Sequence, residues 1–247
     1  MQIIAESSKG NVRSENQDRV NTIELGPSAA FAVVCDGMGG ENAGSFASET
    51  AISVISKRIE SGYRPDSSSA ALKLLLMSAV RTANAVVYDL SETDPMKKGM
   101  GTTAVAVMRC KNVIYCVNVG DSRAYLINGG ITQITKDHSA VMQLYESGKI
   151  TFEEMKTHPN RNYLTRAVGV AEHVSPDYFE LNADSGSIVL LCSDGLCGVC
   201  SDEEILSAVK GCPLAEIPKK LIDLALECGS RDNITAAVIS GFDDTDI

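Results

Sequence analysis

The chain has 247 residues, of which 44% are hydrophobic, and a formal net charge of −10. A chain of this length can bury about 70 to 75% of its unfolded surface and can fold as one large domain. The negative charge argues against nucleic acid or an anionic membrane as the main partner, because most of this surface would repel both. We therefore expect a single globular domain over residues 1–247 that binds neither of them.

The opening segment "MQIIAESSKGNVR" (residues 1–13) has no apolar core of the length found in a signal peptide. No later apolar run approaches the about 18 residues that a membrane span requires. The eight cysteines lie mostly inside apolar segments, which is typical of free thiols in a reducing compartment. We expect a cytoplasmic protein. We also expect a structural role for the single CxxC pair, Cys197 and Cys200, because a zinc site needs further ligands and none lies nearby in the sequence.

Short runs rich in Val, Ile, Ala and Thr, bounded by Gly, Asn or Asp, predict strands along the chain. These runs are residues 29–35, 102–109, 112–119, 123–127, 131–134, 187–192 and 234–240. Apolar residues that repeat at three- and four-residue steps predict helices over residues 41–61, 68–92, 202–210 and 214–228. The short connections "RCKN" and "NGG" suit hairpins, so we expect packed antiparallel sheets flanked by helix pairs.

Residues 137–174 differ from the rest of the chain. They carry most of the histidines and two short helical pieces, and they lie between predicted strands. A connection of this length outside the sheets predicts a mobile surface subdomain.

Four acidic residues stand where predicted strands begin or end, Asp36, Asp121, Asp194 and Asp232, and a fifth, Asp18, follows "RSEN". A single Asp-Gly after a strand is most often only a turn. Strand ends of one sandwich can converge, however, and converging carboxylates repel one another unless cations or protons neutralise them. An all-oxygen ligand set suits hard cations such as Mg²⁺ and Mn²⁺. These acids therefore predict a metal site.

Gly37 directly follows Asp36 and begins the glycine-rich "GMGG". Because glycine has no side chain, we expect the backbone to turn sharply there and to bring the Gly37 carbonyl within reach of the metal that Asp36 binds.

Seven motifs, in order along nearly the whole chain, resemble those of the metal-dependent type 2C protein serine/threonine phosphatases in their compact bacterial form. They are "GNVRSENQD", "VVCDGMGG", "GMGTTAV", "VNVGDSRAY", "TKDHS" through "LTRAVG", "LLCSDGL" and "SRDNIT". The resemblance implies an α+β fold, a four-layer α-β-β-α sandwich of two mostly antiparallel sheets flanked by helix pairs, with a flap subdomain at approximately residues 137–176. It also implies an activity, the hydrolysis of phosphoserine and phosphothreonine in proteins by a metal-bridging water or hydroxide.

The resemblance implies a role for each acid. Asp36 would bridge two metal ions and Gly37 would offer its carbonyl to the second. Asp194 and Asp232 would hold the first ion, and Asp18 would act on the second through a water. Asp36, Asp194 and Asp232 would thus act in catalysis through metal-activated water.

Two further residues match the family. Asp121, together with Asp194, matches the acids that hold a third, weaker ion in bacterial relatives. Arg13 matches the residue that binds the substrate phosphate, for which a planar, bidentate guanidinium is well suited; otherwise it is a solvated loop arginine. Paired divalent ions lower the pKa of a shared water, and they reverse the local charge so that an acidic protein can accept a phosphate.

One position departs from the family pattern. Some members place a His directly after the Asp-Gly of the second motif, where it is a proposed proton donor, but this chain has Met38, which cannot donate a proton. His138 and His158 are candidate substitutes, although an exposed or hydrogen-bonded histidine is the simpler interpretation of both. The general acid is therefore left unassigned.

Other chemistries fit the sequence poorly. None of the eight cysteines is followed six positions later by the Arg that a cysteine-nucleophile phosphatase needs. The segment "GMGGENAG" lacks the Lys-Ser/Thr pair of a P-loop and the spacing of a dinucleotide fingerprint. The segment "GDSRA" lacks the second glycine of a nucleophile elbow.

Two functions follow from the sequence. The first is a Mn²⁺- or Mg²⁺-dependent phosphatase, a monomer whose partners are phosphorylated proteins, including a Ser/Thr kinase and its substrates. The second is a catalytically silent phosphoprotein-binding regulatory module of the same fold. The intact acids at positions 36, 194 and 232 favour the first.

Overall fold

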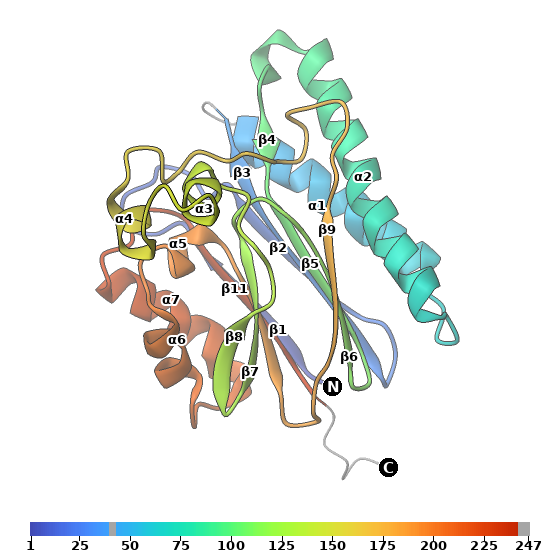
Figure 1. Cartoon of the computed structure of the whole chain (residues 1–247). Coiled ribbons are helices and arrows are strands. Elements are labelled where there is room, and N and C mark those ends of the chain that lie inside the picture. Colours follow the sequence, from blue (N-terminus) through green and yellow to red (C-terminus); the bar gives the residue numbers. More distant parts are fainter. Residues whose placement is uncertain (40–42, 242–247) are drawn as a thin grey trace.

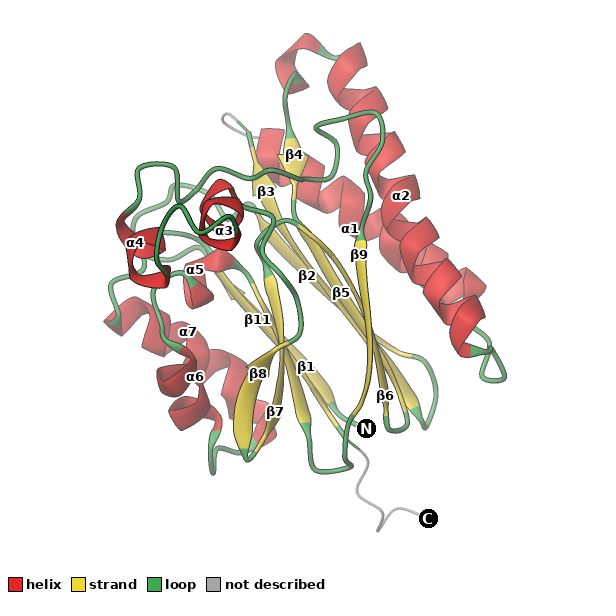
Figure 2. Ribbon diagram, viewed as in Figure 1, coloured by secondary structure: helices red, strands yellow, loops and turns green. Residues whose placement is uncertain are grey.

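Two antiparallel sheets pack against each other in the centre of the molecule, with helices on both outer sides (Figures 1 and 2). The structure is a computed structural model and describes residues 1–39 and 43–241. The first sheet has the order β1 (Ile3–Ser8), β11 (Ile234–Ser240), β10 (Ile188–Cys192), β7 (Arg123–Asn128), β8 (Gly130–Gln133). The second has the order β2 (Asp18–Glu24), β3 (Ala29–Met38), β5 (Ala104–Cys110), β6 (Val113–Val119), β9 (Asp177–Asn182), and the short β4 (Gly101–Thr102) pairs with β3.

The helices form one layer on each side of the sheets (Figure 2). The second sheet is covered by α1 (Ala43–Gly62) and α2 (Ser69–Thr93), and the first by α6 (Asp202–Val209) and α7 (Ile217–Glu227). Shorter elements are α5 (Asp194–Cys197) and the 3-10 turns Pro95–Lys97 and Leu214–Glu216. Between β8 and β9 lie α3 (Ala140–Glu146) and α4 (Phe152–Thr157).

Three separate apolar cores hold the four layers together. Strand β3 shows the reason, because its alternating side chains enter two of them. Phe31 and Val33 pack toward α1 and α2, whereas Ala32 and Val34 pack between the sheets. A strand that is buried on both faces reads as a continuous apolar run, and burial of its side chains supplies the main driving force for this arrangement.

The predicted fold class is confirmed, and the predicted strands and helices are all present with small shifts at their ends. Both predicted hairpins form, between β5 and β6 and between β7 and β8. The helix expected over 41–61 is seen from Ala43 onward, and its first two expected positions lie outside the described residues. The sequence reading did not name β1, β2 and β9, which are edge strands with half-exposed side chains and a weak apolar signal.

Helix α2 corrects the expectation that no apolar run is long enough for a membrane span. Within the described part of the chain it is long and apolar enough to cross a membrane by length and composition alone. In the fold, however, its residues Leu72, Leu76, Val80 and Val87 are buried in the core shared with α1 and the second sheet. The apolar character of α2 is thus accounted for by packing.

The connection between β8 and β9 leaves the sheets and carries α3 and α4, as the sequence predicts (Figure 1). Ser139 caps the start of α3, and Thr151 and Glu154 form a capping box at the start of α4. We call residues 137–176 the flap. Its mobility stays a prediction.

Gly195 lies where α5 packs against the chain before β11. A Cβ atom added at Gly195 would lie 1.9 Å from the carbonyl oxygen of Asn233, and the two backbone segments adjoin the paired strands β10 and β11. We expect Gly195→Ala to lower the free energy of unfolding by about 1–3 kcal/mol or more, as overpacking does. Urea denaturation measures this.

The matched control is Gly186→Ala. Gly186 lies in an exposed loop, and an added Cβ would meet no atom within 4 Å. This variant should be neutral or more stable by about 0.4–1 kcal/mol, because alanine restricts the unfolded chain. Equal stabilities for the two variants would contradict the packing argument.

Candidate metal centre

A cavity of about 650 Å³ opens at the end of the sandwich where the flap joins the sheets. Four aspartates from distant parts of the chain line it, together with Glu15: Asp36 in β3, Asp121 in the β6–β7 loop, Asp194 at the start of α5 and Asp232 just before β11. Arg13, from the β1–β2 connection, lies on the same cavity. The structure thus brings these five predicted site residues together on one cavity, and their roles stay predictions.

Asp18 lies behind the cavity wall, opposite Asp36 across the β2–β3 ladder. Its side chain is only 2% exposed. The hydroxyls of Ser193 and Thr235 donate to its Oδ2 at 2.6 and 2.7 Å, while its buried Oδ1 has no hydrogen-bond partner among the described residues. Burial raises the pKa of Asp18 to about 6. One carboxylate oxygen is therefore fixed and the other is left for a ligand.

The backbone around Asp36 is held from β4 and β5. Its N–H donates to the Thr103 hydroxyl at 2.9 Å, and its carbonyl accepts from the Thr103 N–H and the Thr102 hydroxyl at 2.8 and 2.9 Å. Burial raises the pKa of Asp36 well above its usual range, and the charges of Asp18 and Asp194 raise it further. Such mutual repulsion is the signature of carboxylates that have been brought together.

Gly37 corrects one detail of the sequence reading. The strand does not turn sharply there, because β3 runs on to Met38 and Gly37 pairs with Thr102 of β4. A Cβ atom at Gly37 would instead lie 2.1 Å from the carbonyl oxygen of Gly44 in α1. Glycine is needed for the close approach of helix and strand. The role of the Gly37 carbonyl as a metal ligand stays a prediction.

The remaining acids differ in their partners. The Oδ1 of Asp194 is buried without a hydrogen-bond partner among the described residues, and the pKa of Asp194 is raised by burial and by Asp232. Burial and the charge of Asp194 raise the pKa of Asp121 to about 8. Asp232 is more exposed and accepts a hydrogen bond from Nη2 of Arg13 at 2.7 Å.

These residues fit hard cations. The donors facing the cavity are carboxylates, and the buried oxygens of Asp18 and Asp194 lack partners. Across residues 1–39 and 43–241, no three His, Cys, Asp or Glu side chains form a group that could by itself hold a metal ion. Mg²⁺ usually keeps several waters and binds through one or two protein carboxylates.

Asn233 is a site residue that the sequence reading missed. Its Oδ1 accepts from the Gln17 N–H at 2.8 Å, and its Nδ2 donates to the carbonyls of Lys9 and Glu15 at 2.9 Å each. One buried amide thus fixes both ends of the loop that carries Arg13, next to Asp232. The only sequence signal was its place beside Asp232 in "SRDNIT".

The residues considered for the role of general acid differ in whether they line the cavity. Met38 lines the cavity, whereas His138 and His158 are not among its lining residues. His138 is buried and hydrogen-bonded, and Nδ1 of His158 accepts from the Asn160 N–H at 3.1 Å. The simpler interpretation of both histidines thus agrees with the structure. The cysteines Cys197 and Cys200 are free thiols.

Comparison with known proteins places the chain in a family. Residues 6–234 match the family model described as protein phosphatase 2C. The serine/threonine protein phosphatase PstP of Mycobacterium tuberculosis is 38% identical over 235 residues, which are 95% of this chain and 44% of that relative. This chain therefore spans less than half of the length of that relative. A putative protein phosphatase 2C-type of Streptococcus pyogenes is 34% identical over 242 residues, 97% of each chain.

A solved structure, that of the catalytic domain of PstP in complex with two manganese ions, has a TM-score of 0.85 to this chain at 36% identity. The match covers 98% of both chains. The chain belongs to the protein phosphatase 2C family, which is metal-dependent.

The raised pKa values predict how a divalent cation changes stability with pH. A carboxyl whose pKa is raised on folding stabilises the protein while protonated, and this contribution is lost as pH rises from about 4 through the folded value. For Asp18 and Asp121 the folded values are about 6 and about 8. In chelator, the apo protein should therefore lose stability between pH 5 and pH 8.

Added Mn²⁺ should raise the melting temperature more at pH 8 than at pH 5, because protons compete with the cation for the same oxygens. At a concentration of about 100 times Kd the gain at pH 8 is about 2.7 kcal/mol. Thermal scans at both pH values, with chelator or with Mn²⁺, measure it. Equal shifts at the two pH values would exclude these carboxylates as the binding site.

Proposed function

We propose that this chain is a protein phosphatase that hydrolyses phosphoserine and phosphothreonine in proteins, with two Mn²⁺ or Mg²⁺ ions bound in the acidic cavity. The observation that carries the proposal is the convergence of Asp36, Asp194 and Asp232, together with Arg13, on one cavity. Membership of the protein phosphatase 2C family supports it.

Asp36, Asp194 and Asp232 would hold the two ions, with the Gly37 carbonyl as a further ligand. Asp18 does not line the cavity, so it would act through a water that its unpartnered Oδ1 accepts from. Two divalent cations, when bound, lower the pKa of a shared water and neutralise the charge of the phosphate. Asp121 and Asp194 would hold a third, weaker ion.

Arg13 would bind the phosphate. The ion pair with Asp232 raises its pKa, so the guanidinium stays charged. A guanidinium has several N–H donors in a fixed fork, and Asp232 accepts from Nη2 alone. The other donors remain for phosphate oxygens, so Arg13 can contact the substrate and a metal-binding acid together.

The protonation of the leaving alcohol is left to water. Among the described residues that line the cavity there is no histidine, and Met38 cannot donate a proton. The catalytically silent alternative has no observation in its favour, and the presence of Asp36, Asp194 and Asp232 on one cavity supports the enzyme.

The partners follow from the reaction. Phosphorylated proteins are the substrates, among them a Ser/Thr kinase and its targets. We infer a monomer in the cytoplasm, since free cysteines and an acidic surface suit that compartment.

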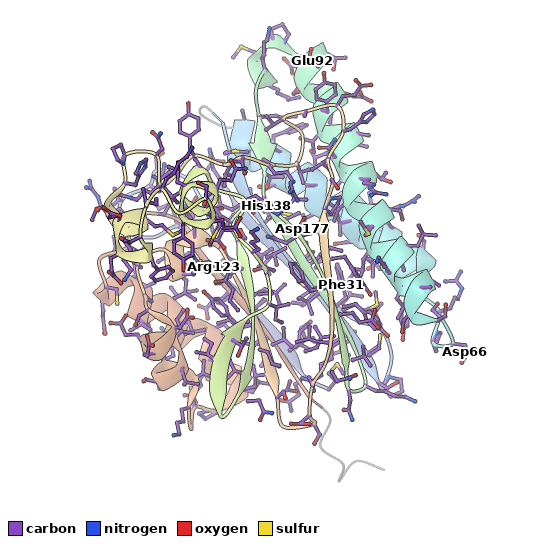
Figure 3. All side chains as sticks on the ribbon, viewed as in Figure 1. Phe31, Asp66, Glu92, Arg123, His138 and Asp177 are labelled. Atoms are coloured by element: carbon purple, nitrogen blue, oxygen red, sulfur yellow. The ribbon has the colours of Figure 1, made fainter. Side chains whose placement is uncertain are left out.

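Asp194→Ala should lower phosphate release from a phosphothreonine peptide by more than about 100-fold. Loss of a residue that hydrogen-bonds a metal ligand costs about 10- to 100-fold in activity, and loss of the ligand itself should cost at least as much. Chelator should abolish the activity of the parent protein. Asp66→Ala is the matched control, because Asp66 is exposed at the far end of the α1–α2 pair (Figure 3). Turnover that survives chelator, or no turnover at all, defeats the proposal.

Arg13→Ala should raise KM and lower kcat/KM by roughly 10- to 100-fold, the worth of a charge-assisted hydrogen bond. Arg13→Lys should recover only part of the loss, because an ammonium lacks the planar fork. Steady-state kinetics on the same peptide give both constants. An unchanged KM in both variants would show that Arg13 is a solvated loop arginine that does not bind the substrate phosphate.

A further inference from the structure

Asp121 lies in a short loop whose other residues are each tied to a different neighbour. Asp121 lines the cavity, whereas Gly120 and Ser122 of the loop, and Arg123 at the start of β7, make the contacts that hold the loop. The Ser122 hydroxyl lies 2.7 Å from the Thr103 hydroxyl, which also accepts from the Asp36 N–H. This contact connects the loop of Asp121 to the strand of Asp36.

His138 holds the other side of the loop. The backbone N–H of His138 donates to the Gly120 carbonyl at 2.9 Å, and the backbone N–H of Gly120 donates to the ring Nδ1 of His138 at 3.0 Å. Gly120 has a φ of 108°, and a Cβ atom there would lie 2.6 Å from the Thr103 side chain. The two reciprocal hydrogen bonds therefore fix the residue before Asp121 in a conformation that favours glycine.

The second ring nitrogen of His138 reaches Asp177, the first residue of β9, which directly follows the flap. Because Nδ1 accepts, the proton is on Nε2, which donates to Oδ2 of Asp177 at 3.0 Å. The other oxygen of Asp177 accepts from Arg166, and the Thr165 N–H donates to the His138 carbonyl at 2.8 Å. Figure 3 shows His138 and Asp177 close together above the strands. His138 thus joins both ends of the flap to one loop.

The residue before His138 reinforces this arrangement. Asp137 is 7% exposed and accepts from Nε and Nη2 of Arg123 at 2.9 and 2.7 Å. Gln133 also donates to Asp137, at 3.0 Å. Two successive flap residues therefore bind the chain on both sides of Asp121.

We propose that His138 is a positioning residue, which aims the Asp121 carboxylate into the cavity by accepting the Gly120 N–H on Nδ1. This role rests on the proposed function, in which Asp121 binds the third, weaker ion. His138 does not touch the substrate. It makes the geometry of that ion site depend on the position of the flap.

The two faces of the imidazole can be tested separately. His138→Asn places Oδ1 where Nδ1 lies and can still accept from Gly120, but it loses Asp177. His138→Gln reaches the position of Nε2 and can still donate to Asp177, but it loses the acceptor for Gly120. A merely structural role predicts similar losses for both variants.

The first measurement is hydrogen exchange of the Gly120 amide in the full chain with chelator present, which needs no metal and no activity. Exchange should rise by roughly three- to tenfold in His138→Gln, as for one lost hydrogen bond, and stay near the parent value in His138→Asn. His158→Asn and His158→Gln are matched controls on the flap and should leave it unchanged. Equal exchange in the two His138 variants overturns the proposal.

The second measurement is calorimetric titration with Mn²⁺. The weakest binding step should weaken in His138→Gln and be retained in His138→Asn. Added to Asp121→Ala, His138→Gln should cause no further loss, because the two changes act through one carboxylate. Independent, additive losses overturn the proposal. If His138→Gln does not fold, His138→Asn decides alone: retained Gly120 protection and Mn²⁺ binding support the proposal, and loss of both refutes it.

These outcomes are distinct from failure of the proposed function. A parent protein that releases no phosphate with Mn²⁺ would refute the phosphatase. The Gly120 exchange would still report whether His138 holds the loop.

Discussion

The electrostatic cost of gathering acidic side chains at one end of a sandwich is the constraint on which this site depends. Asp18 and Asp36 face each other across one strand pair, and the pKa of each is raised by burial and by its acidic neighbours. Two neutral hydroxyl donors offset part of the cost, because they satisfy one oxygen of Asp18. The rest of the cost is left for cations to remove.

Much of the fold could be predicted because its central strands carry a strong signal. A strand such as β3, buried on both faces, is a continuous apolar run. The two short hairpin connections are too short for a parallel crossover, so the strands that they join must be antiparallel. Asp36, Asp121, Asp194 and Asp232 were found because each stands beside an apolar run, whereas Asp18 was found through its motif, "GNVRSENQD". Edge strands such as β2 were not predicted, because a half-exposed strand with mixed apolar and polar side chains resembles a loop in sequence.

What the sequence could not reveal are contacts between segments that are far apart in the chain. The need for glycine at position 37 comes from the carbonyl of Gly44 in a helix that packs against the strand, and local turn chemistry did not indicate it. Asn233 and His138 act through backbone groups, which carry no side-chain signature. Sequence patterns thus identify the residues that line a cavity more readily than the residues that position them through backbone hydrogen bonds.

The hydrogen bond between Arg13 and Asp232 has a thermodynamic consequence. In the proposed function one carboxylate, that of Asp232, would serve two cations, the guanidinium of Arg13 and a divalent ion, so binding of either would change the free energy of binding the other. Such linkage is reciprocal: whatever factor the ion contributes to phosphate affinity, phosphate must contribute to ion affinity. With these roles, ion binding and substrate binding would form one coupled equilibrium, whose coupling depends on the strength of a single exposed ion pair.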